Sequence, residues 1–286
     1  MNHHESVAAP GLTTAADVAA LAWRDAWRLQ ARNHPWMTGG LGLALLAVAL
    51  LLAAGIRQGL TGGGEPLRLA VLGGLAGFGA TAVGALAGVT LRRLSQRAED
   101  SLLGFAAGMM LAASSFSLIL PGLAAAREMT GSGPQAALTV VGGMALGVLL
   151  MLGLDRFTPH EHDSTGPCGP GCERIGRVWL FVLAITLHNL PEGMAIGVSF
   201  AQGDMNVGLP LTSAIAIQDI PEGLAVVMAL RAAGIGSWPA VLMAGASGLM
   251  EPLGSLFGAG IAGGLALAYP VGLGLAAGAM IFVVSH

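Results

Sequence analysis

Two short stretches within apolar parts of the chain contain the same order of residue types. LHNLPEG covers residues 187–193 and IQDIPEG covers residues 217–223, so in each an apolar residue is followed by two polar residues, a second apolar residue, a proline, a glutamate and a glycine. A third stretch, SGLMEPLG at 247–254, adds Glu251. Carboxylate, imidazole and amide groups are ligands for divalent metal ions. The three stretches therefore predict a cation site.

The spacing of these polar residues favours their convergence on helices. Residues at positions i and i+3 or i+4 lie on one face of an α-helix. The polar residues of each repeat therefore form one cluster, and the two clusters lie on neighbouring helices. The predicted metal site consists of His188, Asn189, Glu192, Gln218, Asp219, Glu222 and Glu251.

The proline and the glycine of each repeat support this site. Pro191 and Pro221 have no N–H, so the carbonyls four residues earlier lose their helical partners and become available as ligands or hydration points. Gly193 and Gly223 have no side chain, so a neighbouring helix or a hydrated ion can approach closely.

The elements that carry these residues must lie in a membrane. Of the 286 residues, 54% are hydrophobic and 10% are charged, whereas about 25% are charged in soluble domains. A helix of roughly 20 apolar residues crosses a bilayer, and backbone groups cannot stay unpaired in lipid. We predict an all-α integral membrane protein with about eight transmembrane helices. The predicted spans are 36–56, 67–91, 101–125, 134–154, 177–200, 205–230, 238–262 and 267–284.

The same pattern predicts the organisation and orientation of the chain. Residues 1–35 form an N-terminal segment with a candidate surface helix, 36–56 form an extra transmembrane helix, and 57–286 form the helix bundle. Ten arginines lie in the N-terminal segment and in every second loop, against three in the other loops. This excess puts the N-terminus and the loop at 155–176 in the cytoplasm of a bacterial cell, with the bundle in the inner membrane. The last span ends at His286 without a polar tail, so we expect one further helix to be missing.

The buried carboxylates indicate what the bundle does. The four acids of the predicted site fall near the middle of their spans, and no span has a central Arg or Lys. A charged side chain at mid-membrane costs roughly 2.5–3.5 kcal/mol on insertion scales. Either several acids stay protonated or cations supply the missing charge, and two divalent ions balance four carboxylates. The two repeats lie on antiparallel neighbours, which indicates an inverted repeat with a mid-membrane binding site.

The types of ligand narrow the choice of ion. Oxygen ligands with one imidazole and no cysteine in a span disfavour Cu(I), and the imidazole disfavours a Mg²⁺ or Ca²⁺ specialist, which leaves Zn²⁺, Fe²⁺, Mn²⁺, Co²⁺ and Cd²⁺. The weaker ligand candidates are Met110, His160, His162, Cys168, Cys172 and His286. Met110 is either a packing residue, or a soft, weak ligand or gate that faces the site. The His and Cys residues of the loop either belong to a polar linker or catch ions on the cytoplasmic side.

HNLPEG, followed by QDIPEG and by a Glu in the next span, resembles the ZIP family of metal transporters, prokaryotic branch. The specific match covers about residues 185–255, and the arrangement of spans extends it to about 60–286. The resemblance implies a secondary transporter that takes up Zn²⁺ first, with Cd²⁺, Fe²⁺, Mn²⁺ and Co²⁺ as further ions, by alternating access. It implies no enzymatic activity. The chain departs from the family at Gln218, where a His is common, and in its extra first helix and absent last one.

The resemblance also implies how up to two ions are held. The residues that would bind the primary ion are His188, Glu192, Gln218 and Glu222. The residues that would bind the second ion are Asn189, Asp219 and Glu251, with Glu192 and Glu222 bridging. The expected partners are divalent metal ions and the lipid bilayer, with a homodimer as one arrangement of the chain and no nucleic acid.

Two alternatives stay open at this point, and a third is disfavoured. A proton-coupled carrier of another substrate would use the buried acids as a relay. A metal-selective channel would use the same residues without alternating access. A membrane enzyme is disfavoured, because the spans contain no HExxH motif for a zinc protease and only one His, where a di-iron carboxylate site needs two Glu-x-x-His units.

Overall fold

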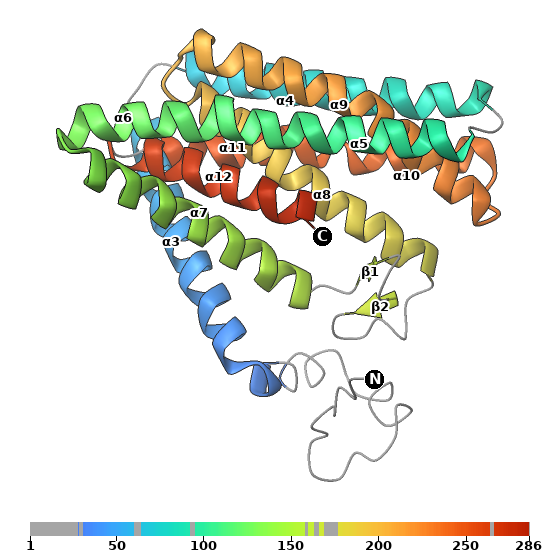
Figure 1. Cartoon of the computed structure of the whole chain (residues 1–286), viewed down its shortest axis with the longest axis horizontal. Helices are drawn as coiled ribbons and strands as arrows, with labels where there is room; N and C mark the ends of the chain where they lie inside the picture. The colour runs from blue at the N-terminus through green and yellow to red at the C-terminus, as the bar shows by residue number, and fades with distance from the viewer. Residues whose placement is uncertain are drawn as a thin grey trace.

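The fold is a bundle of long helices (Figure 1). This computed structural model describes residues 28, 31–59, 64–91, 95–157, 160–162, 166–168, 177–263 and 266–285. Within them, seven helical segments are long and apolar enough to cross a membrane. These segments coincide with the last seven predicted spans, so the predicted helical membrane bundle is confirmed. Helix α3 (Pro35–Gly59) covers the first predicted span, and its crossing of the membrane stays a prediction.

The other elements follow α3 in chain order. The helices are α4 (Glu65–Thr90), α5 (Gln96–Ala112), the π-helix η1 (Ala113–Ile119), α6 (Leu120–Thr130), α7 (Gly133–Phe157), α8 (Arg177–Phe200), α9 (Met205–Ala232), α10 (Ser237–Ser247), α11 (Met250–Ala262) and α12 (Ala268–Ser285). Between α7 and α8, strands β1 (His160–His162) and β2 (Gly166–Cys168) pair in an antiparallel ribbon. The sequence predicts only a loop there, because three-residue strands lack a periodic pattern.

Two spans contain irregularities that follow from prolines. The π-helix η1 interrupts the third span directly before Pro121, and its wider turn accommodates a residue that has no N–H to donate. The seventh span is broken between α10 and α11, just before Pro252. Because Pro252 cannot donate to the carbonyl of Gly248, the regular helix ends there. The break places Glu251 in the first turn of α11, where the helix dipole favours a carboxylate.

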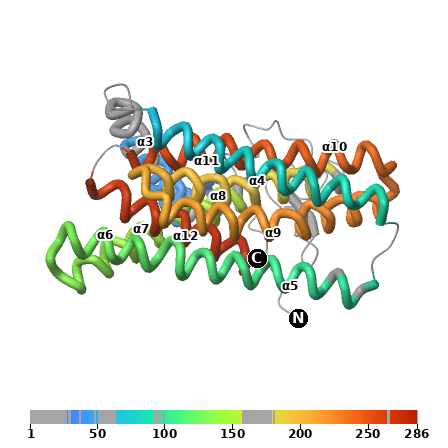
Figure 2. The backbone as a smooth tube through the Cα atoms, turned by 90° about the horizontal axis from the view of Figure 1, so that it is seen from above, coloured from blue at the N-terminus to red at the C-terminus, as the bar shows by residue number. Residues whose placement is uncertain are grey.

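Glycines let three pairs of helices meet through their backbones. A Cβ on Gly193 of α8 would overlap the backbone of Glu251 on α11, and a Cβ on Gly223 of α9 would overlap that of Thr81 on α4. Helices α7 and α12 meet in the same way at Gly147. One closely packed group therefore contains α4, α8, α9 and α11, and another contains α7 and α12. In Figure 2, α8 and α9 run between α4 and the long helix formed by α5, η1 and α6.

We predict that Gly147→Ala lowers the melting temperature of the detergent-solubilised protein. The added methyl group would overlap the backbone of α12, and overpacking costs typically about 1–3 kcal/mol. Gly142→Ala is the matched control, because Gly142 lies on the exposed face of the same helix with nothing within 4 Å of an added Cβ. The measurement is thermal unfolding followed by intrinsic fluorescence. Equal melting temperatures for the two variants would contradict the backbone contact between α7 and α12.

Candidate metal site

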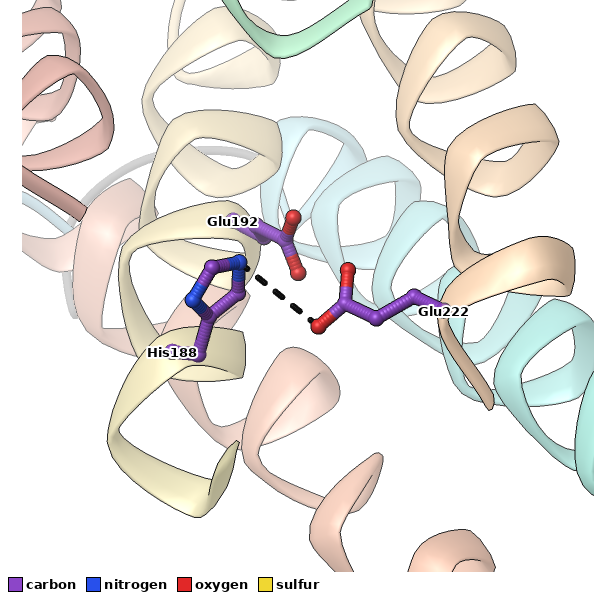
Figure 3. Close-up of side chains that lie close together, drawn as sticks. All are labelled: His188, Glu192 and Glu222. Atoms are coloured by element: carbon purple, nitrogen blue, oxygen red, sulfur yellow. Dashed lines mark ion pairs between the residues drawn. The ribbon is translucent and has the colours of Figure 1, made fainter. Parts of the chain in front are cut away.

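Three side chains from α8 and α9 face one another in the bundle (Figure 3). His188 Nε2 lies 3.6 Å from Glu222 Oε1, and one ligand atom from each of His188, Glu192 and Glu222 lies within 4.8 Å of the others. Glu192 is fully buried, whereas the side chains of His188 and Glu222 are 30% and 16% exposed. The spacing is close to that of ligands around one ion, since Zn²⁺ lies about 2.0–2.2 Å from nitrogen and oxygen ligands.

Gln218 and Asp219 extend this cluster from the α9 side. Gln218 Nε2 donates a hydrogen bond of 2.5 Å to Glu192 Oε1, which ties the two repeats together. The buried Gln218 Oε1 and Asp219 Oδ2 have no hydrogen-bond partner. Unpaired buried oxygens are costly, so both atoms are available to a cation.

Asn189 and Glu251 lie on the other side of the cluster. Asn189 is 2% exposed, and its Nδ2 donates a weak hydrogen bond of 3.5 Å to Ser247 Oγ, which leaves its carbonyl oxygen as the candidate ligand. Glu251 is fully buried. Its Oε1 accepts a hydrogen bond of 2.7 Å from Thr81 Oγ1, whereas its Oε2 has no partner.

The charges of this site repel one another. Glu192 interacts unfavourably with Glu222 and Glu251, and Asp219 with all three other acids. In the part of the chain that the structure describes, no arginine pairs with any of these carboxylates, and the chain has no lysine. Charges in a low-dielectric bundle interact strongly. A divalent cation among these oxygens would reverse the sign of the local electrostatics and give the unpaired atoms a partner.

A cavity of about 410 Å³ begins at this cluster. His188 and Glu222 line its inner end, together with Met110, which is 2% exposed. The cavity continues to Asp155 near the end of α7 and to Val284 near the end of α12. It therefore connects the site with the end of the bundle that carries the loop at 155–176.

The remaining predicted residues have different outcomes. Pro191 and Pro221 lie inside α8 and α9, which continue through them. His160, His162 and Cys168 lie on the ribbon, where His160 is opposite Cys168 in the strand register. Cys172 and His286 lie outside the residues that the structure describes. Metal binding by all of these, and by the central residues, stays a prediction.

Three residues that contact the site were not predicted from the sequence. Thr81 and Ser247 hydrogen-bond to Glu251 and Asn189, and a Cβ on Gly77 would overlap Glu251 Oε2. Small and hydroxyl residues are common in membrane helices, so their types alone do not distinguish them. The only feature of the sequence that could have indicated Thr81 is its position one helical turn after Gly77, in a predicted span without acidic residues.

The fold and the site together define a class of protein. The chain is a multi-pass helical membrane protein, with acids and a histidine at mid-helix and a cavity that leads to them, and ionisable residues inside a membrane are typical of ion pathways.

Comparison with known proteins gives the family. The profile of the family described as ZIP Zinc transporter matches residues 155–285. The chain is 66% identical over 264 residues to Zinc transporter ZIPB of Bordetella bronchiseptica, covering 92% of this chain and 85% of that protein. It is 41% identical over 207 residues to Zinc transporter GufA of Myxococcus xanthus (72% and 82% covered) and 30% identical over 299 residues to Zinc transporter ZIP11 of Homo sapiens (75% and 86% covered). The chain belongs to the ZIP family, so the predicted resemblance is confirmed.

We predict that Zn²⁺ stabilises the purified protein against heat. An ion that binds only the folded state at 100 times its dissociation constant adds about 2.7 kcal/mol to the free energy of unfolding. The melting temperature should rise with Zn²⁺ and fall back when a chelator is added. In the double variant Glu192→Gln/Glu222→Gln the rise should be lost, because two of the negative ligands are neutral. The control Glu128→Gln alters an exposed acid on α6 and should keep the rise; a Zn²⁺ effect of equal size in all three proteins would place the binding elsewhere.

Proposed function

We propose that this chain is a secondary transporter that carries divalent transition-metal ions, Zn²⁺ first, across the bacterial inner membrane into the cytoplasm. The observation that carries the proposal is the cluster of His188, Glu192 and Glu222 at the inner end of a cavity. The names of the relatives support zinc as the ion. Cd²⁺, Fe²⁺, Mn²⁺ and Co²⁺ fit the same ligand types.

The primary ion binds to the two repeats in this proposal. Its ligands are His188, Glu192, Gln218 and Glu222, with Met110 as a soft neighbour across the cavity. One imidazole among oxygen ligands suits a borderline ion such as Zn²⁺. Gln218 contributes a neutral oxygen, so the primary site carries two negative charges for one divalent ion.

A second ion binds next to the first one. Its ligands are Asn189, Asp219 and Glu251, with Glu192 and Glu222 bridging the two ions. Unpaired oxygens on Glu192, Asp219 and Glu251 support this arrangement. With two divalent ions the four carboxylates are neutralised, which a single ion does not achieve.

Alternating access is supported by the contrast between the two sides of the site. The cavity leads from His188 toward the ends of α7 and α12. In the opposite direction along α9, Leu211 and Ile215 are fully buried in a cluster of apolar side chains that also contains Met110 and Leu273. The cavity thus gives an ion a path toward the end of the bundle that carries the loop at 155–176, and the buried side chains of Leu211 and Ile215 support a closed opposite side. In this proposal the two closely packed groups of helices move relative to each other to open that side, and the loop at 155–176 is cytoplasmic.

Zinc uptake by proteoliposomes tests the proposal. We expect saturable uptake of radiolabelled Zn²⁺ by the wild type, and at least about a hundredfold loss in Glu192→Ala and Glu222→Ala, because each removes a charged ligand. Glu128→Ala should transport at the wild-type rate. Absence of zinc flux in folded wild-type protein would favour the proton-coupled carrier, and flux that does not saturate would favour a channel.

The direction of the cavity gives a separate prediction. In a Cys168→Ser/Cys172→Ser background, Ala229→Cys places a thiol on the cavity wall. A membrane-impermeant thiol reagent should label it from the cytoplasmic side of inverted vesicles and not from the periplasmic side of intact spheroplasts. Ala214→Cys, on the same helix but packed against the closed apolar cluster, should stay unlabelled from both sides. Labelling of Ala229→Cys only from the periplasmic side would reverse the proposed orientation.

A further inference from the structure

Both carboxylate oxygens of Glu251 lie against α4. Thr81 Oγ1 donates a hydrogen bond of 2.7 Å to Oε1. Oε2 occupies the space that a side chain on Gly77 would fill, and Asp219 Oδ2 lies 3.3 Å from the position of a Cβ on Gly77. Because Gly77 and Thr81 are one helical turn apart, they lie on the same face of α4. Helix α4 thus holds one oxygen of Glu251 and leaves room for the other beside Asp219.

The glycine contacts show that Thr81 and Glu251 are equivalent positions in the inverted repeat. Gly223 of α9 meets the backbone of Thr81, as Gly193 of α8 meets the backbone of Glu251. One turn further, the same equivalence holds between two more glycines: Gly84 meets Ile220 on α9, and Gly254 meets Leu190 on α8. The α4–α9 pair and the α11–α8 pair therefore have the same register.

This equivalence means that the two halves of the repeat supply different groups at one position. The α11 half supplies the carboxylate of Glu251, and the α4 half supplies the hydroxyl of Thr81. The four carboxylates already balance two divalent ions. A fifth carboxylate at position 81 would add an uncompensated charge in a low-dielectric interior, which is costly. A neutral donor at this position avoids that charge and still contacts the site.

We propose that Thr81 is a positioning residue for the second metal ion, an inference that rests on the binuclear site of the proposed function. The hydroxyl of Thr81 fixes the orientation of the Glu251 carboxylate by a hydrogen bond to Oε1, so that Oε2, which has no hydrogen-bond partner, faces the second ion. Because Gly77 has no side chain, Oε2 of Glu251 fits beside Asp219. Asp219 is itself buried, with an exposure of 1%. Without the hydroxyl, Glu251 loses the contact that fixes its orientation, whereas no ligand of the primary ion touches Thr81 through a hydrogen bond among the described residues.

The test is Cd²⁺ binding to the full chain in detergent, followed by cadmium-113 NMR and by titration. The primary site contains the His188 nitrogen and the second site only oxygen ligands, so the two ions should give separate resonances. In Thr81→Val, which keeps the shape and removes the donor, the oxygen-only resonance should shift or disappear. The dissociation constant of the second ion should rise about tenfold, and that of the first should change less, because only the bridging carboxylates connect it to the altered site.

Three further variants separate the hydroxyl from packing. Thr81→Ser keeps the donor and should restore both resonances. Gly77→Ala should lose the oxygen-only resonance, because its methyl group displaces Oε2. Thr212→Val is the matched control, since Thr212 is also a buried threonine but its Oγ1 has no hydrogen-bond partner and it lies outside the site; it should keep both resonances.

The outcomes distinguish this inference from the proposed function. Two ions bound with unchanged affinities in Thr81→Val would overturn the role of Thr81 and leave the transporter intact. Equal loss in Thr81→Val and Thr81→Ser would also overturn it, because the effect would then come from packing and not from the hydroxyl. Wild-type protein that binds no Cd²⁺ and no Zn²⁺ would overturn the proposed function itself.

Discussion

The structure depends on keeping four carboxylates inside an apolar helix bundle in which no described arginine pairs with them and the sequence has no lysine. Their repulsion would drive the helices apart unless other contacts hold them. Two kinds of contact do so: hydrogen bonds from neutral donors, such as Gln218 to Glu192, and backbone contacts between helices. Neither removes the negative charge, and several carboxylate oxygens stay unpaired. In the proposed function, cations supply the missing positive charge, so the contacts that stabilise the fold and the ligands of the ions lie in the same place.

The glycines are the means by which the helices stay close enough to build this site. Lipid offers little hydrophobic drive for helix association, so close packing of small residues supplies it. Gly193 and Gly223 bring the backbones of α11 and α4 against the two repeats. Gly193 and Gly223, which are the last residues of the two repeats, thus set how close Glu251 and Thr81 lie to the centre of the candidate metal site. Packing and ligand geometry are coupled here, and a change at one glycine alters both.

The sequence predicted the helical spans well because apolar length is a local property. The last seven spans agree with the structure to within a few residues, apart from the third, which runs to Thr130 rather than 125. The sequence also predicted correctly that His188, Glu192 and Glu222 lie close together, because the i+4 spacing and the repeated motif can be read from a single sequence. The break before Pro252, the π-helix before Pro121 and the contact of Thr81 with Glu251 were not predicted. The contact of Thr81 with Glu251 depends on which helix lies opposite, and the two residues are 170 positions apart. The two irregularities lie next to prolines, but α8 and α9 continue through Pro191 and Pro221, so a proline in a span does not by itself predict a break.

The burial of the site residues also orders the two ions along the proposed path. His188 and Glu222 are partly exposed to the cavity, so water can replace their metal ligands as an ion leaves. Asp219 and Glu251 are 1% and 0% exposed, and an ion held there has no such replacement, because dehydrated carboxylates bind a cation strongly in a low-dielectric interior. In the proposed function, the primary ion, which has two ligands that face the cavity, therefore exchanges with the cavity first. The second ion would leave only after the bundle rearranges or after its carboxylates gain another source of positive charge, and it would be the more permanent counter-charge of the site.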